Sequence, residues 1–345
     1  MPGILIKGKY CFIYLLLLVA AAIGAGPIRA FQGGIDKNIN SWEKPIAKCW
    51  SLDAEFLLDV PSIPVKGIIY AALEDGSVMA IDTVSGKQVW LSRLGGVIGK
   101  MELSDSGRLA VLTGQEGEKK DSKTLFLQVL SGETGLTVWR KELEFSGDVS
   151  IGADKKSIGV TRRADGSQIW FDLETGEREG GGGAWLAKAG EGYRRFIIGK
   201  DESKHLNEDL SILTDSMGNI SAGPWKARVG AEVSDISLSD QGLIVSSADN
   251  FVYMLTVNRG DRKWKRKFTG RLLGTPVLHK NYGLFVTVAG TEAIILDLTN
   301  GKVVNNIPLA DGAFFTGSTI GTETGFALMT SRGMLFYSPE GCDKK

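Results

Sequence analysis

Histidine is scarce in this sequence of 345 residues, and its scarcity excludes several kinds of chemistry. His205 and His279 are the only two histidines, which leaves little material for a zinc cluster or a histidine-based catalytic centre. The sequence has no Cys-x-x-Cys pair and no Gly-x-Ser-x-Gly elbow. The 40 basic residues balance the 40 acidic ones, so the basic excess of a nucleic-acid-binding protein is also missing. We therefore expect no nucleic-acid partner.

Proline is also rare, whereas glycine is abundant. The chain holds 9 prolines and 45 glycines. Glycine at about twice its usual share, with little proline, is typical of many tight turns rather than of low-complexity linkers. The composition therefore predicts many short elements joined by turns.

The one long apolar run lies near the N-terminus, at residues 10–25, and follows Lys7 and Lys9. Its 16 residues are short for the roughly 20 that cross a bilayer, and basic, apolar and small residues follow in the order of a secretory signal. We expect a signal peptide at residues 1–30, a linker at 31–45 and export to the periplasm. The alternative is an uncleaved anchor in the inner membrane. Cys11 stands at the start of the run, which is not the place of a lipid-acceptor cysteine.

A repeat of about forty residues runs through the rest of the chain. Asp75, Asp82, Gly86 and Trp90 follow one another in steps of seven, four and four. Asp249, Thr256, Gly260 and Trp264 repeat the same steps, and partial copies fill the space between and after. Each copy contains about four short alternating or apolar runs separated by Gly, Asn or Asp turns, and none shows a sustained helical period.

Four strands in forty-odd residues make the unit of a β-propeller blade. The sequence thus predicts an all-β chain with one propeller domain at residues 46–345. It has four-stranded antiparallel blades, seven in number, with eight as the alternative.

The repeat resembles that of the PQQ-like, quinoprotein-type propeller family, in its non-catalytic BamB-like branch. The family's outer hairpin commonly reads aspartate, Thr/Ser-Gly-Lys and then tryptophan. The resemblance rests on IDTVSGKQVW, which carries the whole pattern, and on FDLETGE and LDLTNGK, which carry part of it. The family includes redox enzymes and scaffolds. As the resemblance implies, the redox enzymes of this family use an acidic general base, a calcium site and a pair of adjacent cysteines. The sequence has no Cys-Cys pair, and we expect no PQQ and no other cofactor.

We interpret the recurring residues as structural. The glycines are expected in turns with positive φ, the aspartates as acceptors of backbone N–H groups in those turns, and the tryptophans as side chains that dock one blade on the next. A cation site at the aspartates and a ligand stacked on the tryptophans are the alternatives. The residues are Asp82, Gly86, Trp90, Gly135, Trp139, Asp172, Gly176, Trp225, Gly260, Trp264, Asp297 and Gly301.

The last copy lacks its fourth strand, and a strand built around Trp50 precedes the first copy. We expect this N-terminal strand to complete the last blade, which would bring Cys49 close to Cys342. A disulfide between them is the hypothesis, and two unpaired cysteines are the alternative.

Two features could bind a partner: two long loops, and a basic stretch at residues 259–271. A basic outer strand can equally serve to prevent edge-to-edge aggregation. The candidate surface comprises Lys119, Lys120, Lys204, His205, Arg262, Lys263, Lys265, Arg266 and Lys267.

Taken together, these patterns predict an exported, monomeric, non-catalytic scaffold that binds another protein of the cell envelope. Outer-membrane protein assembly is the process that the resemblance implies. Contact with the membrane is expected only through an uncleaved N-terminal segment or through a partner. The alternatives are a PQQ-dependent dehydrogenase and a protein that binds a small ligand such as a quinone or a sugar.

Overall fold

The computed structural model describes most of the chain beyond residue 40. The described residues are 41–57, 60–116, 123–144, 147–162, 167–179, 193–199, 206, 208–310 and 312–342. The chain divides into a unit Met1–Asn38 and a unit Ile39–Lys345, and the description concerns the second. The expected signal peptide and its cleavage site lie outside the described residues. No helix in the described ranges is both long and apolar enough to span a membrane.

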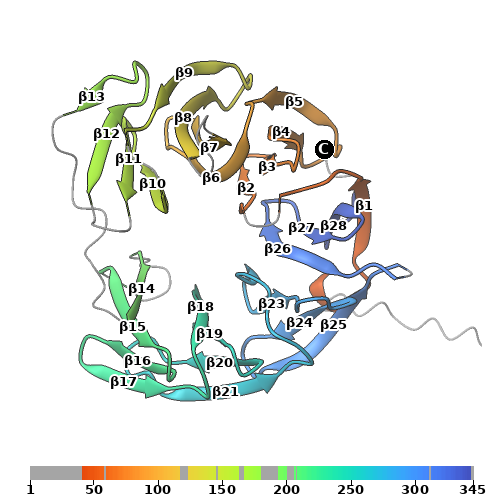
Figure 1. The fold of residues 1–345 in the computed structure, drawn as a ribbon. Helices are drawn as coiled ribbons and strands as arrows, with labels where there is room; N and C mark the ends of the chain where they lie inside the picture. The colour runs from red at the N-terminus through yellow and green to blue at the C-terminus, as the bar shows by residue number, and fades with distance from the viewer. Residues whose placement is uncertain are drawn as a thin grey trace, which may run out of the picture. The chain divides into compact units, whose positions relative to one another are not determined.

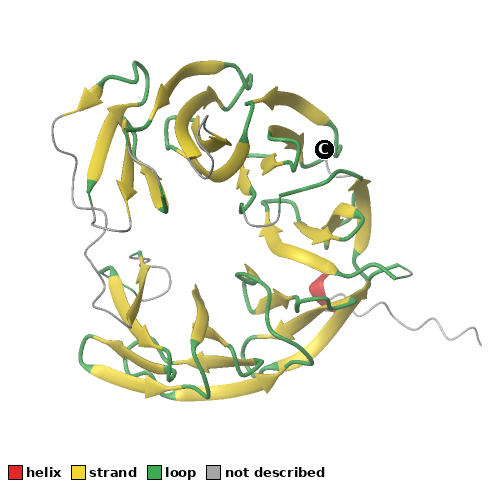
Figure 2. Ribbon diagram, viewed as in Figure 1, coloured by secondary structure: helices red, strands yellow, loops and turns green. Residues whose placement is uncertain are grey.

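The described strands form seven antiparallel sheets of four strands each, which follow one another around a ring (Figure 1). The prediction of an all-β propeller with seven blades is confirmed. In the described part of the chain, the helical content is one short 3₁₀ turn beside β25 (Figure 2).

Six blades are built from consecutive strands, ordered from the inner to the outer edge of each sheet. Blade 1 consists of β2 (Ile63–Val65), β3 (Ile68–Ala72), β4 (Ser77–Asp82) and β5 (Gln88–Arg93). Blade 2 consists of β6 (Val97–Leu103), β7 (Arg108–Glu116), β8 (Lys123–Ser131) and β9 (Thr137–Glu142). Blade 3 consists of β10 (Val149–Ala153), β11 (Ser157–Arg162), β12 (Gln168–Asp172) and β13 (Arg178–Glu179).

The second half of the ring repeats this order. Blade 4 consists of β14 (Tyr193–Ile198), β15 (Leu210–Asp215), β16 (Asn219–Ala222) and β17 (Trp225–Arg228). Blade 5 consists of β18 (Val233–Ser239), β19 (Gly242–Ser247), β20 (Phe251–Leu255) and β21 (Arg262–Lys267). Blade 6 consists of β22 (Val277–His279), β23 (Tyr282–Phe285), β24 (Glu292–Asp297) and β25 (Lys302–Pro308).

Blade 7 joins the two ends of the ring. It takes β26 (Phe315–Gly321), β27 (Phe326–Thr330) and β28 (Gly333–Ser338) from the C-terminal part, and β1 (Ala47–Leu52) as its outer strand. β1 pairs antiparallel with β28, from Ala47 opposite Ser338 to Leu52 opposite Met334. The predicted closure by the N-terminal strand is therefore present.

The position of a strand within its blade explains its sequence pattern. The middle strands are mostly apolar because side chains of neighbouring blades pack against them. In β3, for example, four of the five residues are buried. An outer strand has solvent on its free edge, and in β9 only Trp139 is buried. The hydrophobic core consequently lies between neighbouring blades, as where Tyr70, Val78 and Trp90 of blade 1 pack with Leu109 and Val111 of blade 2.

Candidate functional site

The recurring tryptophans lie at the seams between neighbouring blades. Each extends from the outer strand of one blade, and its indole N–H donates to a backbone carbonyl of the next blade at 2.8–2.9 Å. The five bonds run from Trp50 to Thr83, Trp90 to Gly132, Trp139 to Leu173, Trp225 to Val257 and Trp264 to Leu298.

A turn glycine of the next blade lies under each of these rings. Gly135 shows the arrangement: its φ is +71°, and a Cβ there would lie 2.5 Å from Cε3 of Trp90. Gly86, Gly176, Gly260 and Gly301 have the same conformation under Trp50, Trp139, Trp225 and Trp264. Glycine is required for two reasons, the left-handed backbone and the space that the indole occupies. The glycine and tryptophan of the repeat thus belong to one contact between two blades.

The boundary between blades 6 and 7 is built differently. Four residues after Gly301, where the other copies have tryptophan, stands Asn305. Its side-chain amide donates to the carbonyls of Trp42 at 3.1 Å and Lys44 at 2.6 Å. Trp42 is 4% exposed and packs against Phe326 of blade 7 and His279 of blade 6, with ring centroids 5.5 and 5.4 Å apart. A residue from before the first strand therefore fills this seam.

This part of the chain differs from the expected linker at residues 31–45. Ser41–Glu43 form the 3₁₀ turn η1, and Glu43 accepts a hydrogen bond from the Tyr282 hydroxyl at 2.5 Å. That bond raises the pKa of Tyr282 to about 12. The physical reason for the difference is the apolar area of Trp42, whose burial stabilises the fold by about 2–3 kcal/mol. The rest of the expected linker, residues 31–40, lies outside the described part.

The recurring aspartates organise the turns that carry the glycines. Asp82 accepts hydrogen bonds from the Ser85 N–H at 2.7 Å and the Ser85 hydroxyl at 2.6 Å. Asp172 accepts the same pair from Thr175, and Asp297 from Thr299. In the described ranges, no three His, Cys, Asp or Glu side chains gather as metal ligands would.

The hydrogen bonds of these turns make their strength depend on pH. The Ser85 hydroxyl and then the Ser85 N–H lower the pKa of Asp82 below its ordinary value, and the Thr175 N–H and hydroxyl do the same for Asp172. A carboxyl group whose pKa is lowered by folding adds stability above its unfolded pKa. That stability is lost as the pH falls through the lowered value.

We predict that Asp82→Asn is less stable than the unchanged protein at pH 6, and that the difference shrinks as the pH is lowered from about 4 towards 3. Protonation at low pH removes the negative charge of Asp82. The Asn variant carries no charge at any pH, so the two proteins become alike. Urea unfolding at each pH measures the difference. Asp240→Asn, on an exposed turn, is the control. A difference that stays constant over this range would contradict the assignment.

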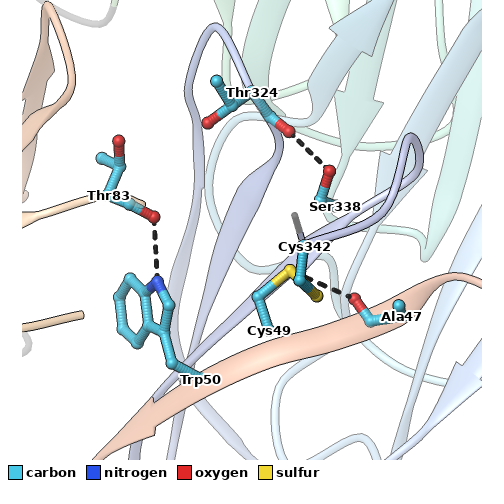
Figure 3. Close-up of a disulfide and its surroundings, with 7 residues drawn as sticks. All are labelled: Ala47, Cys49, Trp50, Thr83, Thr324, Ser338 and Cys342. Carbon is cyan, nitrogen blue, oxygen red and sulfur yellow. Dashed lines mark hydrogen bonds between the residues drawn. A yellow bond between two sulfur atoms is a disulfide. The ribbon is translucent and has the colours of Figure 1, made fainter. Parts of the chain in front are cut away.

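Cys49 and Cys342 form a disulfide, as predicted (Figure 3). Their Cα atoms are 5.1 Å apart, and the two residues are separated by 293 positions in the sequence. Cys49 lies on β1 next to Trp50, whose indole N–H points to the Thr83 carbonyl of blade 1 (Figure 3). One short strand therefore joins blade 7 to the C-terminal segment through sulfur and to blade 1 through the indole.

The structure describes only part of the candidate interaction surface. Lys119, Lys120, Lys204 and His205 lie outside the described residues. Arg262, Lys263, Lys265, Arg266 and Lys267 all lie on β21, the free outer edge of blade 5. Within the described residues, no carboxylate forms an ion pair with these five cations.

Three of the five cations on β21 have other partners within the molecule. The Lys263 ammonium donates to the Gln241 carbonyl at 2.6 Å, and the Arg266 guanidinium donates to the Gly301 carbonyl at 3.3 Å. Lys265 Nζ lies 5.0 Å from the centre of the Phe251 ring. Arg262 and Lys267 are exposed, as are Lys263 and Lys265, but the first two make none of these contacts. An anionic partner would therefore find fewer uncommitted cations on β21 than the five basic residues in the sequence suggest.

Comparison with known proteins finds a family model and solved structures that resemble this chain. A family model described as outer membrane protein assembly factor BamB matches residues 154–319. No curated protein sequence matches the chain. The crystal structure of BamB from Moraxella catarrhalis is 14% identical and covers 85% of this chain and 99% of its own, with a TM-score of 0.47. The crystal structure of Ika8, a computationally designed protein, is 11% identical and covers 84% of this chain and 99% of its own, with a TM-score of 0.50.

At these identities the likeness to solved structures concerns the fold alone. The match of the family model concerns the sequence. It covers three of the four strands of blade 3 (β11 to β13), blades 4 to 6 and part of β26 in blade 7. The chain is thus a seven-bladed propeller, of which residues 154–319 match the family model of the assembly factor BamB.

Proposed function

We propose that this chain is an exported, non-catalytic scaffold that binds another protein of the cell envelope and acts in outer-membrane protein assembly. The match of residues 154–319 to the family of the assembly factor BamB is the observation that carries the proposal. The residues that recur in this chain support it from the structure. Their hydrogen bonds and ring contacts connect one blade to the next, so the repeat is maintained by the architecture of the ring rather than by a shared reactive group.

The free outer strands are the surfaces that such a scaffold offers to a partner. β21 presents exposed Arg262 and Lys267 on the edge of blade 5, without an acidic partner in the described part of the chain. An acidic segment of a partner protein has the complementary charge, and charge complementarity between two surfaces favours fast and selective association.

Crosslinking in the native envelope tests the proposal. A photo-reactive residue is placed at Lys267 on β21 or at Lys120, with Gln88 on the exposed outer strand of blade 1 as control. We expect one envelope protein to be crosslinked from Lys267 or Lys120 and not from Gln88. In cells that lack the chain, we expect less assembled outer-membrane protein, restored by the unchanged gene. Absence of both effects would refute the proposal.

The alternative, a PQQ-dependent dehydrogenase, is tested on the purified protein. PQQ and calcium are added, and the quinone absorbance and the reduction of a dye by alcohols or sugars are followed. We propose that neither changes. Turnover above that of PQQ and calcium without protein would replace the scaffold proposal with a redox enzyme.

A further inference from the structure

Blade 3 borders a small cavity that is lined by residues of blades 2 and 3. Its apolar face, with Ile158, Val160 and Phe171, packs against blade 2. On the opposite face, Ser150 of β10 lies opposite Thr161 of β11, and Gly159 lies opposite Trp170 of β12. These four residues belong to the lining of a cavity of about 170 Å³. The sheet thus has an apolar face and a polar, partly hollow one.

The indole of Trp170 lies flat on its own sheet. A Cβ at Gly159 would come within 2.9 Å of the six-membered ring, so glycine leaves the space that the ring needs. Trp170 is 4% exposed. The ring is therefore fixed in place, and its N–H has a defined direction.

Two polar atoms of this lining are buried without a hydrogen-bond partner among the described residues, the Nε1 of Trp170 and the Oγ of Ser150. The contrast with the seams is direct, because all five seam tryptophans donate to a carbonyl at 2.8–2.9 Å. A buried donor without an acceptor is expensive, so natural proteins seldom retain one without a purpose. Trp170 and Ser150 each have such an atom, and both residues line the same cavity.

A carboxyl group from another blade completes the lining. Glu102 lies on β6, the inner strand of blade 2, which runs beside β10. Glu102 is partly buried, and its burial raises the pKa of the carboxyl group above the ordinary value. Among the described residues it makes no hydrogen bond or ion pair. Its ionised form would be stabilised by a cation that enters the cavity.

We propose that this cavity binds a small amino alcohol. The ammonium group pairs with the Glu102 carboxylate, and the oxygen accepts the Trp170 N–H and exchanges a hydrogen bond with the Ser150 hydroxyl. The Trp170 N–H is a donor only and needs an acceptor, whereas the Glu102 carboxylate needs a cation. An ammonium group cannot accept a hydrogen bond, so the ligand must carry an oxygen atom as well as the cation. A cavity of roughly 150 Å³ holds benzene, so 170 Å³ admits a molecule of about six non-hydrogen atoms. The proposal is independent of the scaffold function.

Calorimetric titration of the purified exported protein tests the ligand class. Three probes of similar size are compared: 3-amino-1-propanol, n-butylamine, which lacks the oxygen, and 1,4-butanediol, which lacks the charge. We expect the amino alcohol to bind with a millimolar or lower Kd and the other two at least about tenfold more weakly, because the amine loses the hydrogen bonds of the oxygen and the diol loses the ion pair with Glu102. No binding of the amino alcohol, or equal binding of the diol, would overturn the proposal.

Two variants locate the site. Glu102→Gln keeps the shape of the side chain and removes the charge, and Trp170→Phe keeps a ring and removes the N–H. Both are expected to weaken binding of the amino alcohol about tenfold, whereas Glu142→Gln, on the exposed outer strand of blade 2, leaves it unchanged. Near-ultraviolet circular dichroism checks that each variant is folded. Unchanged affinity in folded Glu102→Gln would show that the ligand binds elsewhere and would refute the site.

Discussion

Replacement of both Cys49 and Cys342 by serine is expected to lower the free energy of unfolding by about 2–5 kcal/mol. The disulfide joins positions 293 residues apart and therefore restricts nearly the whole unfolded chain. For a loop of this length the chain-entropy model gives an upper value of roughly 5–6 kcal/mol. The bond also fixes β1, the strand that completes blade 7 and carries Trp50 into the seam with blade 1. Urea unfolding without reductant measures the loss.

The controls separate the cross-link from the thiols themselves. Either single serine variant is expected to lose as much stability as the double variant, because one missing sulfur already removes the bond. A reductant should destabilise the unchanged protein and leave the double variant as it was. Equal unfolding midpoints without reductant would show that the bond does not form in solution.

Trp90→Ala is expected to cost about 3–5 kcal/mol, the range for removing a large aromatic ring from a core. The ring is 8% exposed and fills the seam between blades 1 and 2, over Gly135. Trp90→Phe should cost far less, about 1 kcal/mol. The Gly132 carbonyl that loses the indole donor still accepts the Tyr70 hydroxyl at 3.0 Å, so no buried acceptor is left alone. Urea unfolding of both variants gives the two values, and Val89→Ala, on an exposed neighbour, is the control.

The same seam can be tested from its other side. Gly135→Ala is expected to be clearly more destabilising than Gly107→Ala, although both glycines have positive φ, +71° and +80°. A Cβ at Gly107 would meet nothing within 4 Å, so that variant measures the backbone strain alone, about 1–2 kcal/mol. The excess at Gly135 measures the contact with the Trp90 ring and with the Ser92 hydroxyl beside it. Equal losses at the two glycines would mean that the ring is not held against the turn.

The repeated contacts could be predicted from the sequence because they recur with fixed spacing. Trp90 and Gly135 could be recognised as recurring residues, since every good copy has a tryptophan and a glycine at the same spacing. That the tryptophan of one copy lies over the glycine of the next is a finding of the structure. The missing fourth strand of the last copy likewise pointed to Trp50 and to the disulfide. A repeat makes visible both the residues that recur in its copies and a copy in which one element is missing.

Features that occur once left no such signal. Trp42 fills the seam in which Asn305 replaces the recurring tryptophan, and the only trace in the sequence is a tryptophan ahead of the first strand. The cavity of blade 3 was not predicted, because strand register brings Ser150, Gly159 and Trp170 together and Glu102 comes from a different sheet. Distances between such residues depend on the packing of two blades, which spacing along the chain does not encode.

The outer strand of blade 7 is synthesised first, and its partner β28 last. Until the final residues exist, β1 has no neighbour to pair with and the thiol of Cys49 has no partner in its own blade. The ring therefore cannot form progressively from its beginning, and a truncated product would retain an unprotected strand and a reactive thiol. An alkylating reagent added during synthesis would distinguish finished chains from unfinished ones by the accessibility of Cys49.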